Sequence, residues 1–170
     1  MADWLHLVSR FFDVVTARPL DDEERRRVTA LLRPGPEAEA FFAQSAADQR
    51  HGLEAAEVVA RQAPGRRDLQ RAALLHDIGK RRSGLGAFGR VVATLTGRIG
   101  GPWGRRHRLY LNHGALGASE LEAWGAEAIV VAYARHHHGE RPAGVDPGEW
   151  ELLLEADGIG RRRRVRETSR

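Results

Sequence analysis

The sequence of 170 residues contains no cysteine. This absence excludes disulfide bonds and thiolate ligands, so any bound metal must be held by histidine, aspartate or glutamate side chains. Such ligands are typical of iron, manganese, zinc, cobalt or nickel centres, and not of structural zinc sites built from thiolates. The eight histidines of the chain are therefore its most informative residues.

Long apolar runs are also missing, since no stretch approaches the roughly 20 uninterrupted apolar residues of a membrane-spanning helix. The N-terminus does not show a basic region, an apolar core and a small-residue cleavage site in that order. We therefore expect no signal peptide, and a cytoplasmic protein. A length of 170 residues fits one domain with a real core.

No alternating strand pattern stands out, whereas apolar residues recur with helical spacing along most of the chain. This pattern predicts an all-α fold, a compact bundle of about seven or eight helices. The expected helices cover residues 4–16, 21–32, a short segment around Phe41, 45–62, 67–77, 88–96, 113–124, 126–138 and the stretch that carries Trp150 to Asp157.

The charge balance is basic, with a formal net charge of +4. The basic residues gather in four clusters, at residues 66–67, 80–82, 105–106 and 161–164. Such clusters suit a phosphorylated substrate, a nucleic acid or an anionic membrane surface. The pair Gly79-Lys80 is not part of a phosphate-binding loop, because it ends a predicted helix and follows no strand.

The stretch from Ala72 to Lys80 organises the chain, because its apolar run ends in His76 and Asp77, two good metal ligands. His76 follows Leu69 at i+7, which places it on the apolar stripe of its helix. Gly79 is expected to end this helix as its C-cap, with Lys80 just beyond the end.

Three further helices place a polar ligand on an apolar face. His51 shares a face with Ala55, Asp157 follows Trp150 at i+7, and either His136 or His137 points inward from its helix. His138 falls on the least apolar face of that helix, and His113 begins another helix. Buried polar groups need partners, so several such positions in one chain predict a metal site in the bundle core.

The ordered set His51, His76-Asp77 and Asp157 resembles the HD superfamily of metal-dependent phosphohydrolases, which is named for its His-Asp doublet. The resemblance covers roughly residues 45–160, and His113 with the run from His136 to His138 is similar to the subset that binds two metals. The resemblance implies a division into an N-terminal helical extension at 1–44, an HD core at 45–160 and a basic tail at 161–170.

In the single-metal form, the resemblance implies that one ion is bound by His51, His76, Asp77 and Asp157. In the two-metal form a second ion shares Asp77 as a bridge and adds His113 and His137. The family's Arg-x-His segment, placed on residues 135–137, selects His137 over its neighbours.

The implied activity is cleavage of a phosphate ester or anhydride, of the nucleotide type, by a metal-activated hydroxide. Asp77 and Lys80 carry the catalytic roles. The expected substrate-binding residues are Lys80, Arg50, Arg81 and Arg135.

Small bacterial HD proteins, including those that cleave dinucleoside polyphosphates, are the nearer matches. A Gly-Tyr-Pro signature after His138 is absent, which argues against relatives that cleave cyclic di-GMP. The alternative function is a non-catalytic metal-binding HD domain that senses or scaffolds, at a membrane surface through the helix at 4–16. Nucleic acid is not the expected partner, because no recognisable reading module is present.

Overall fold

The computed structural model of the chain describes residues 17–85 and 104–158. The expected helices at 4–16 and 88–96 and the basic tail lie outside the described residues. Within the described ranges the fold is all-α, as predicted, with eight α-helices and one 3₁₀ helix and no strand. None of these helices is long and apolar enough to cross a membrane.

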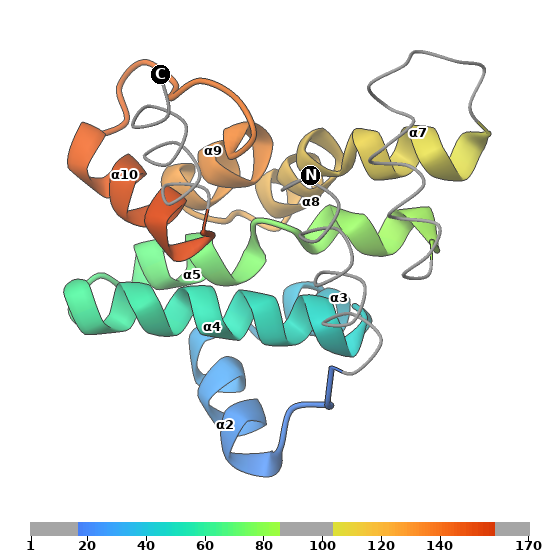
Figure 1. Cartoon of the computed structure of the whole chain (residues 1–170), viewed down its shortest axis with the longest axis horizontal. Coiled ribbons are helices and arrows are strands. Elements are labelled where there is room, and N and C mark those ends of the chain that lie inside the picture. Colours follow the sequence, from blue (N-terminus) through green and yellow to red (C-terminus); the bar gives the residue numbers. More distant parts are fainter. Residues whose placement is uncertain (1–16, 86–103, 159–170) are drawn as a thin grey trace, which may run out of the picture.

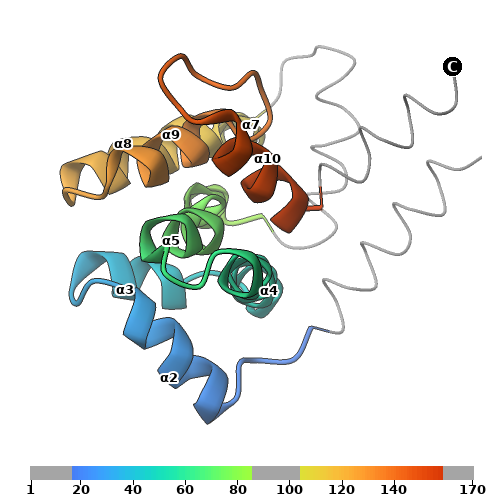
Figure 2. The ribbon, with the colours of Figure 1, turned by 90° about the vertical axis from the view of Figure 1, so that its left-hand side faces the viewer.

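The first half of the described chain forms the lower layers in Figure 2: α2 (Asp22–Leu31), α3 (Pro36–Phe42), α4 (Ala46–Gln62) and α5 (Arg67–Leu75). Asp21 and Glu24 form a reciprocal capping box at the start of α2. Ser45 caps α4 by accepting a hydrogen bond from the backbone of Asp48. These caps explain why both helices begin where the sequence predicts.

The second half of the described chain forms α7 (Arg105–Leu111), α8 (His113–Ala123), α9 (Ala128–His136) and α10 (Pro147–Ala156). Of these, α9 and α10 pack on the other side of α5, whereas α7 and α8 pack on the 3₁₀ segment that follows it. The central helix α5 therefore lies between α4 on one side and α9 on the other (Figure 1). Fully buried Trp150, Tyr133 and Leu74 fill the space around it. The Tyr133 hydroxyl donates to the Leu153 carbonyl at 2.8 Å, which ties α9 to α10.

The chain beyond the His-Asp doublet differs from the prediction. Gly79 does not end the helix, because the chain continues as a 3₁₀ helix, η1, over Ile78–Ser83. The residue with left-handed backbone geometry at the end of η1 is Gly84, with φ of 58°. Lys80 therefore lies inside η1 and not beyond a helix end.

Gly79 instead allows the backbones of η1 and α8 to approach each other closely. A Cβ atom at this position would lie 2.8 Å from the Gly117 nitrogen and 2.9 Å from the His113 carbonyl carbon. Real Cβ atoms essentially never come so close, so only glycine allows η1 to pack on α8 at this distance. This contact brings the start of α8 next to the His-Asp doublet.

Candidate metal centre

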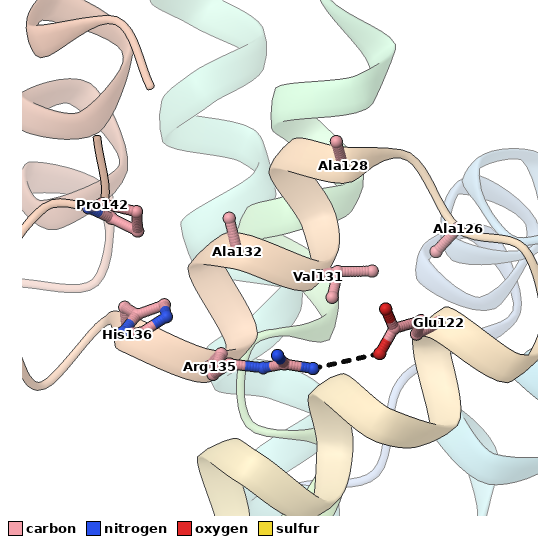
Figure 3. Close-up of a pocket in the computed structure, with 8 residues that line it drawn as sticks. All are labelled: Glu122, Ala126, Ala128, Val131, Ala132, Arg135, His136 and Pro142. Atoms are coloured by element: carbon pink, nitrogen blue, oxygen red, sulfur yellow. Dashed lines mark hydrogen bonds and ion pairs between the residues drawn. The ribbon is translucent and has the colours of Figure 1, made fainter. Parts of the chain in front are cut away.

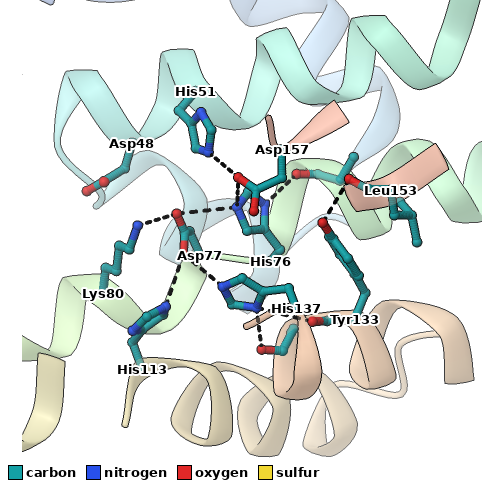
Figure 4. Close-up of polar contacts among 12 residues, drawn as sticks. Asp48, His51, His76, Asp77, Lys80, His113, Tyr133, His137, Leu153 and Asp157 are labelled. Carbon is teal, nitrogen blue, oxygen red and sulfur yellow. Dashed lines mark hydrogen bonds and ion pairs between the residues drawn. The ribbon is translucent and has the colours of Figure 1, made fainter. Parts of the chain in front are cut away.

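The His-Asp doublet lies at the junction between two helical segments. His76 is the C-cap of α5 and Asp77 is the residue that precedes η1. Both side chains are nearly inaccessible, with 1% of His76 and 6% of Asp77 exposed. The junction points both groups into the space between α4, α8, α9 and α10 (Figure 4).

One group of side chains gathers on the α4 side of Asp77. His51 Nε2 lies 2.8 Å from Asp157 Oδ1, and His76 Nε2 lies 3.3 Å from the same oxygen. His76 Nε2 is also 3.3 Å from Asp77 Oδ2. The structure thus brings together all four residues that the sequence predicts for a first ion, and their role as ligands stays a prediction.

A second group gathers on the α8 side of the same carboxylate. Asp77 Oδ1 lies 3.2 Å from His113 Nε2 and 3.5 Å from His137 Nε2. One ligand atom from each of Asp77, His113, His137 and His138 lies within 4.8 Å of the others. The two carboxylate oxygens of Asp77 therefore face two different groups of histidines.

His138 is the residue of the histidine run that the helical pattern favoured least. The expected helix ran to residue 138, and on a continuous helix His138 would lie on the least apolar face. The structure ends α9 at His136, so His138 belongs to the following turn and its ring can approach the site. Its ring centroid lies 3.9 Å from that of His137 and 5.3 Å from that of His113.

His136 lies on the other side of α9. It lines a shallow pocket of about 390 Å³ together with Arg135 and Val131 (Figure 3). None of the clustered ligand atoms belongs to a residue that lines this pocket. The inward position therefore belongs to His137, which is 1% exposed, and not to His136.

The imidazole rings of the three buried histidines are held in one orientation by helix carbonyl groups. Nδ1 of His76 lies 2.8 Å from the Ala73 oxygen, and Nδ1 of His113 lies 2.6 Å from the Tyr110 oxygen. Nδ1 of His137 lies 3.1 Å from the Ala134 oxygen. A carbonyl oxygen can only accept, so Nδ1 carries the proton in each ring and Nε2 faces the cluster.

Polar atoms at the centre of the cluster have no hydrogen-bond partner among the described residues. They are Nε2 of His76, His113 and His137 and Oδ1 of Asp77. Buried polar atoms are rarely left unpaired, because each one costs roughly 1–3 kcal/mol. Imidazole lone pairs and a carboxylate oxygen that face a common point suit a divalent cation, so the donor set fits a metal.

Electrostatics in the cluster keep its carboxylates ionised. Burial alone would raise the pKa of Asp77, but the charges of Lys80 and His76 hold it well below its usual range. Burial likewise opposes the charged form of His76, and the nearby carboxylates of Asp77 and Asp157 still raise its pKa well above the usual value. Burial lowers the pKa of His137, which keeps this imidazole neutral and able to coordinate.

Lys80 is the cation that touches the cluster directly. Its amine forms an ion pair with Asp77 Oδ2, and its side chain is 17% exposed (Figure 4). Burial would lower the pKa of Lys80, but the charge of Asp77, with smaller contributions from Tyr110 and Asp48, raises it. The ammonium group is therefore charged and lies beside the carboxylate that faces both histidine groups.

The structure does not bring the three predicted arginines to this cluster. Arg50 is bound to Glu24, at 2.9 and 3.0 Å, and to the carbonyl groups of residues 18 and 19. Arg81 forms a two-pronged pair with Glu120, at 2.7 and 3.0 Å. Arg135 pairs with Glu122 at 3.1 Å beside the pocket of Figure 3. In the described structure other carboxylates hold all three, and their expected role in substrate binding stays a prediction.

Comparison with known families supports the interpretation of the cluster as a candidate metal centre. A family model described as the HD domain matches residues 49–168, which is more than half of the chain. The chain belongs to the HD domain family. A search of curated proteins and of solved structures finds no match for this HD domain.

Proposed function

We propose that this HD domain is a metal-dependent phosphohydrolase that cleaves a phosphate ester or anhydride of a nucleotide. The observation that supports the proposal most strongly is the set of buried, unpaired donor atoms around Asp77. HD domains are typically metal-dependent phosphohydrolases, and the two histidine groups could each hold an ion.

In this proposal His51, His76, Asp77 and Asp157 hold the first ion. Asp77, His113, His137 and His138 hold the second. Asp77 Oδ2 faces the first group and Oδ1 the second, which suits a carboxylate shared by both ions. Divalent ions held by these residues would supply a water activated near neutral pH and positive charge for a phosphoryl group.

The protein itself supplies orientation and charge. The carbonyl groups that accept from the three Nδ1–H groups fix the rings, so the donor atoms need little reorganisation when ions bind. Lys80 is placed to donate from its ammonium group to a phosphate oxygen, because Asp77 holds it at the edge of the cluster where it is partly exposed. We therefore assign Lys80, and not the three arginines, to the substrate phosphate.

The test begins with protein purified without a histidine tag. Elemental analysis gives its metal content, and a screen of nucleotides and simple phosphate esters with manganese, iron, cobalt and magnesium gives its activity. We expect Asp77→Ala to lose metal and activity, because it removes the carboxylate that faces both groups.

His136→Ala is the matched control, because it removes an exposed imidazole next to His137 that lines the pocket of Figure 3 and does not belong to the cluster. It should keep both metal content and activity, whereas His137→Ala should lose metal. A protein that binds metal and hydrolyses none of these substrates would contradict the enzymatic proposal and favour a sensing or scaffolding role.

A further inference from the structure

Three residues of the cluster are accessible from the surface. The side chain of His51 is 33% exposed and that of Lys80 is 17% exposed, while the His138 residue is exposed. The helix α7 ends two residues before His113 and packs on η1, the segment that carries Lys80.

The helix α7 is basic and carries no acidic residue in the segment Arg105–Leu111. Arg105 and Arg106 are exposed and pair with no carboxylate among residues 17–85 and 104–158. In contrast, Arg81 and Arg82 of the neighbouring η1 share Glu120. Beside η1, Arg105 and Arg106 therefore carry positive charge that no carboxylate of the described residues neutralises.

Two residues of α7 share one side of this helix. Arg106 and Tyr110 are four residues apart within α7, which places their side chains on the same side. The partly exposed Tyr110 ring lies 5.8 Å from the His113 imidazole, at an interplanar angle of 35°. Tyr110 is also close enough to Lys80 to contribute to the raised pKa of its amine.

We propose that Tyr110 and Arg106 form a nucleotide subsite next to the metal cluster, in which the base stacks on Tyr110 and an additional phosphate group binds Arg106. An aromatic ring stacks on any nucleobase, and a guanidinium group binds a phosphate through two parallel hydrogen bonds. Arg106 precedes Tyr110 by four residues, which is about 6 Å along the axis of α7, so a ligand whose base lies on Tyr110 can reach this guanidinium group with a phosphate. This inference rests on the proposed function, because it takes the reacting phosphate to lie at the cluster.

Equilibrium binding tests the role of Tyr110 without requiring turnover. Protein loaded with Mn²⁺ is titrated calorimetrically with each of the four ribonucleoside monophosphates and with ribose 5-phosphate, which lacks a base. We expect at least one nucleotide to bind more tightly than ribose 5-phosphate. Tyr110→Leu should weaken that nucleotide by roughly 5- to 150-fold and leave ribose 5-phosphate unchanged.

Tyr110→Phe keeps the ring and should bind the nucleotide like the unmodified protein. Manganese content is measured for each variant, because a merely structural role of Tyr110 beside His113 would appear as lost metal and as equal losses for both ligands. Equal affinity of the unmodified protein for nucleotides and ribose 5-phosphate would overturn the inference, whether or not the protein hydrolyses either.

Arg106 is tested with a nucleoside triphosphate against its monophosphate. Arg106→Ala should weaken the triphosphate by about 10-fold or more, as expected for a lost charge-assisted contact, and change the monophosphate little. Arg105→Ala is the matched control, because it removes the same charge from an adjacent exposed position that faces away from the Tyr110 side. Equal losses in both variants would indicate only a general electrostatic field and would contradict the assigned contact.

Binding and hydrolysis measured on the same protein distinguish this inference from the proposed function. If nucleotides bind through Tyr110 but nothing is hydrolysed, the subsite stands and the enzymatic proposal fails. If phosphate esters are hydrolysed without any preference for a base, the enzymatic proposal stands and the subsite fails.

Discussion

Replacing Gly79 by alanine tests the link between helix packing and the candidate metal centre. The new Cβ atom would lie 2.8 Å from the Gly117 nitrogen and closer still to the His113 carbonyl oxygen. Both neighbours are backbone atoms and cannot rotate away. The backbones of η1 and α8 must therefore separate by more than about 1 Å to restore ordinary van der Waals contact.

Two effects follow from this separation. Overpacking a core costs about 1–3 kcal/mol, and a backbone clash belongs at the upper end of that range. For a chain of this size a loss of about 3 kcal/mol lowers the melting temperature by roughly 6–12 °C. His113 begins α8, so its Nε2 moves away from Asp77 Oδ1, now 3.2 Å distant. A misplacement of about 1 Å reduces kcat/KM by roughly 100-fold.

The assays are urea unfolding followed by circular dichroism, elemental analysis and hydrolysis of a substrate found in the screen. Gly65→Ala is the control, because its Cβ would meet nothing within 4 Å and its φ is not positive. It should change stability by less than about 1 kcal/mol. An unchanged free energy of unfolding in Gly79→Ala would refute the argument that this glycine exists for the close approach.

Three further predictions concern single contacts. Lys80→Ala should keep the metal content and reduce kcat/KM by about 10- to 100-fold, and full activity would remove Lys80 from phosphate binding. Glu37→Ala should lower the free energy of unfolding by about 3–5 kcal/mol, because it leaves the buried guanidinium group of Arg71, now 2.6 Å away, without this partner. By contrast, the exposed ion pair between Glu23 and Arg26 should contribute less than about 1 kcal/mol to the free energy of unfolding. Burial would raise the pKa of Glu120, but hydrogen bonds from two arginines lower it, so its stabilising effect is present above the unfolded pKa of about 4.3 and lost as the pH falls. The difference in unfolding free energy between the unmodified protein and Glu120→Gln should therefore be constant near neutral pH and shrink in acid.

The helices and the inward-facing candidate ligands could be predicted because both depend on local periodicity. His76 and Asp157 follow apolar residues at helical spacing, and the structure buries both side chains. The caps at Asp21 and Ser45 are also local, since each bonds to a backbone group three residues away. Local signals of this kind do not depend on how the helices pack.

The features that the sequence did not predict depend on contacts between residues far apart in the sequence. Arg50 seemed available for a substrate, but Glu24, 26 residues earlier, binds it. The approach of His138 to the cluster was not foreseen, because α9 ends at His136, two residues before the predicted end of this helix. The helix α7 was not predicted, because its arginine-rich sequence shows no apolar stripe, and the structure packs it on η1.

The spacing of the candidate ligands is set by backbone contacts more than by side-chain packing. His51 precedes Gly52, whose Cβ would lie 2.6 Å from the Leu74 oxygen, and His113 precedes Gly114, whose Cβ would lie 2.9 Å from the Ala134 oxygen. With Gly79, these glycines place α4 on α5, η1 on α8 and α8 on α9 at distances that no larger residue permits. Backbones cannot adopt another rotamer, so contacts of this kind hold each histidine at a fixed distance from Asp77. A centre with two groups of donors around one carboxylate requires these fixed distances. A change of about 1 Å at any one contact separates a histidine from the oxygen that it faces.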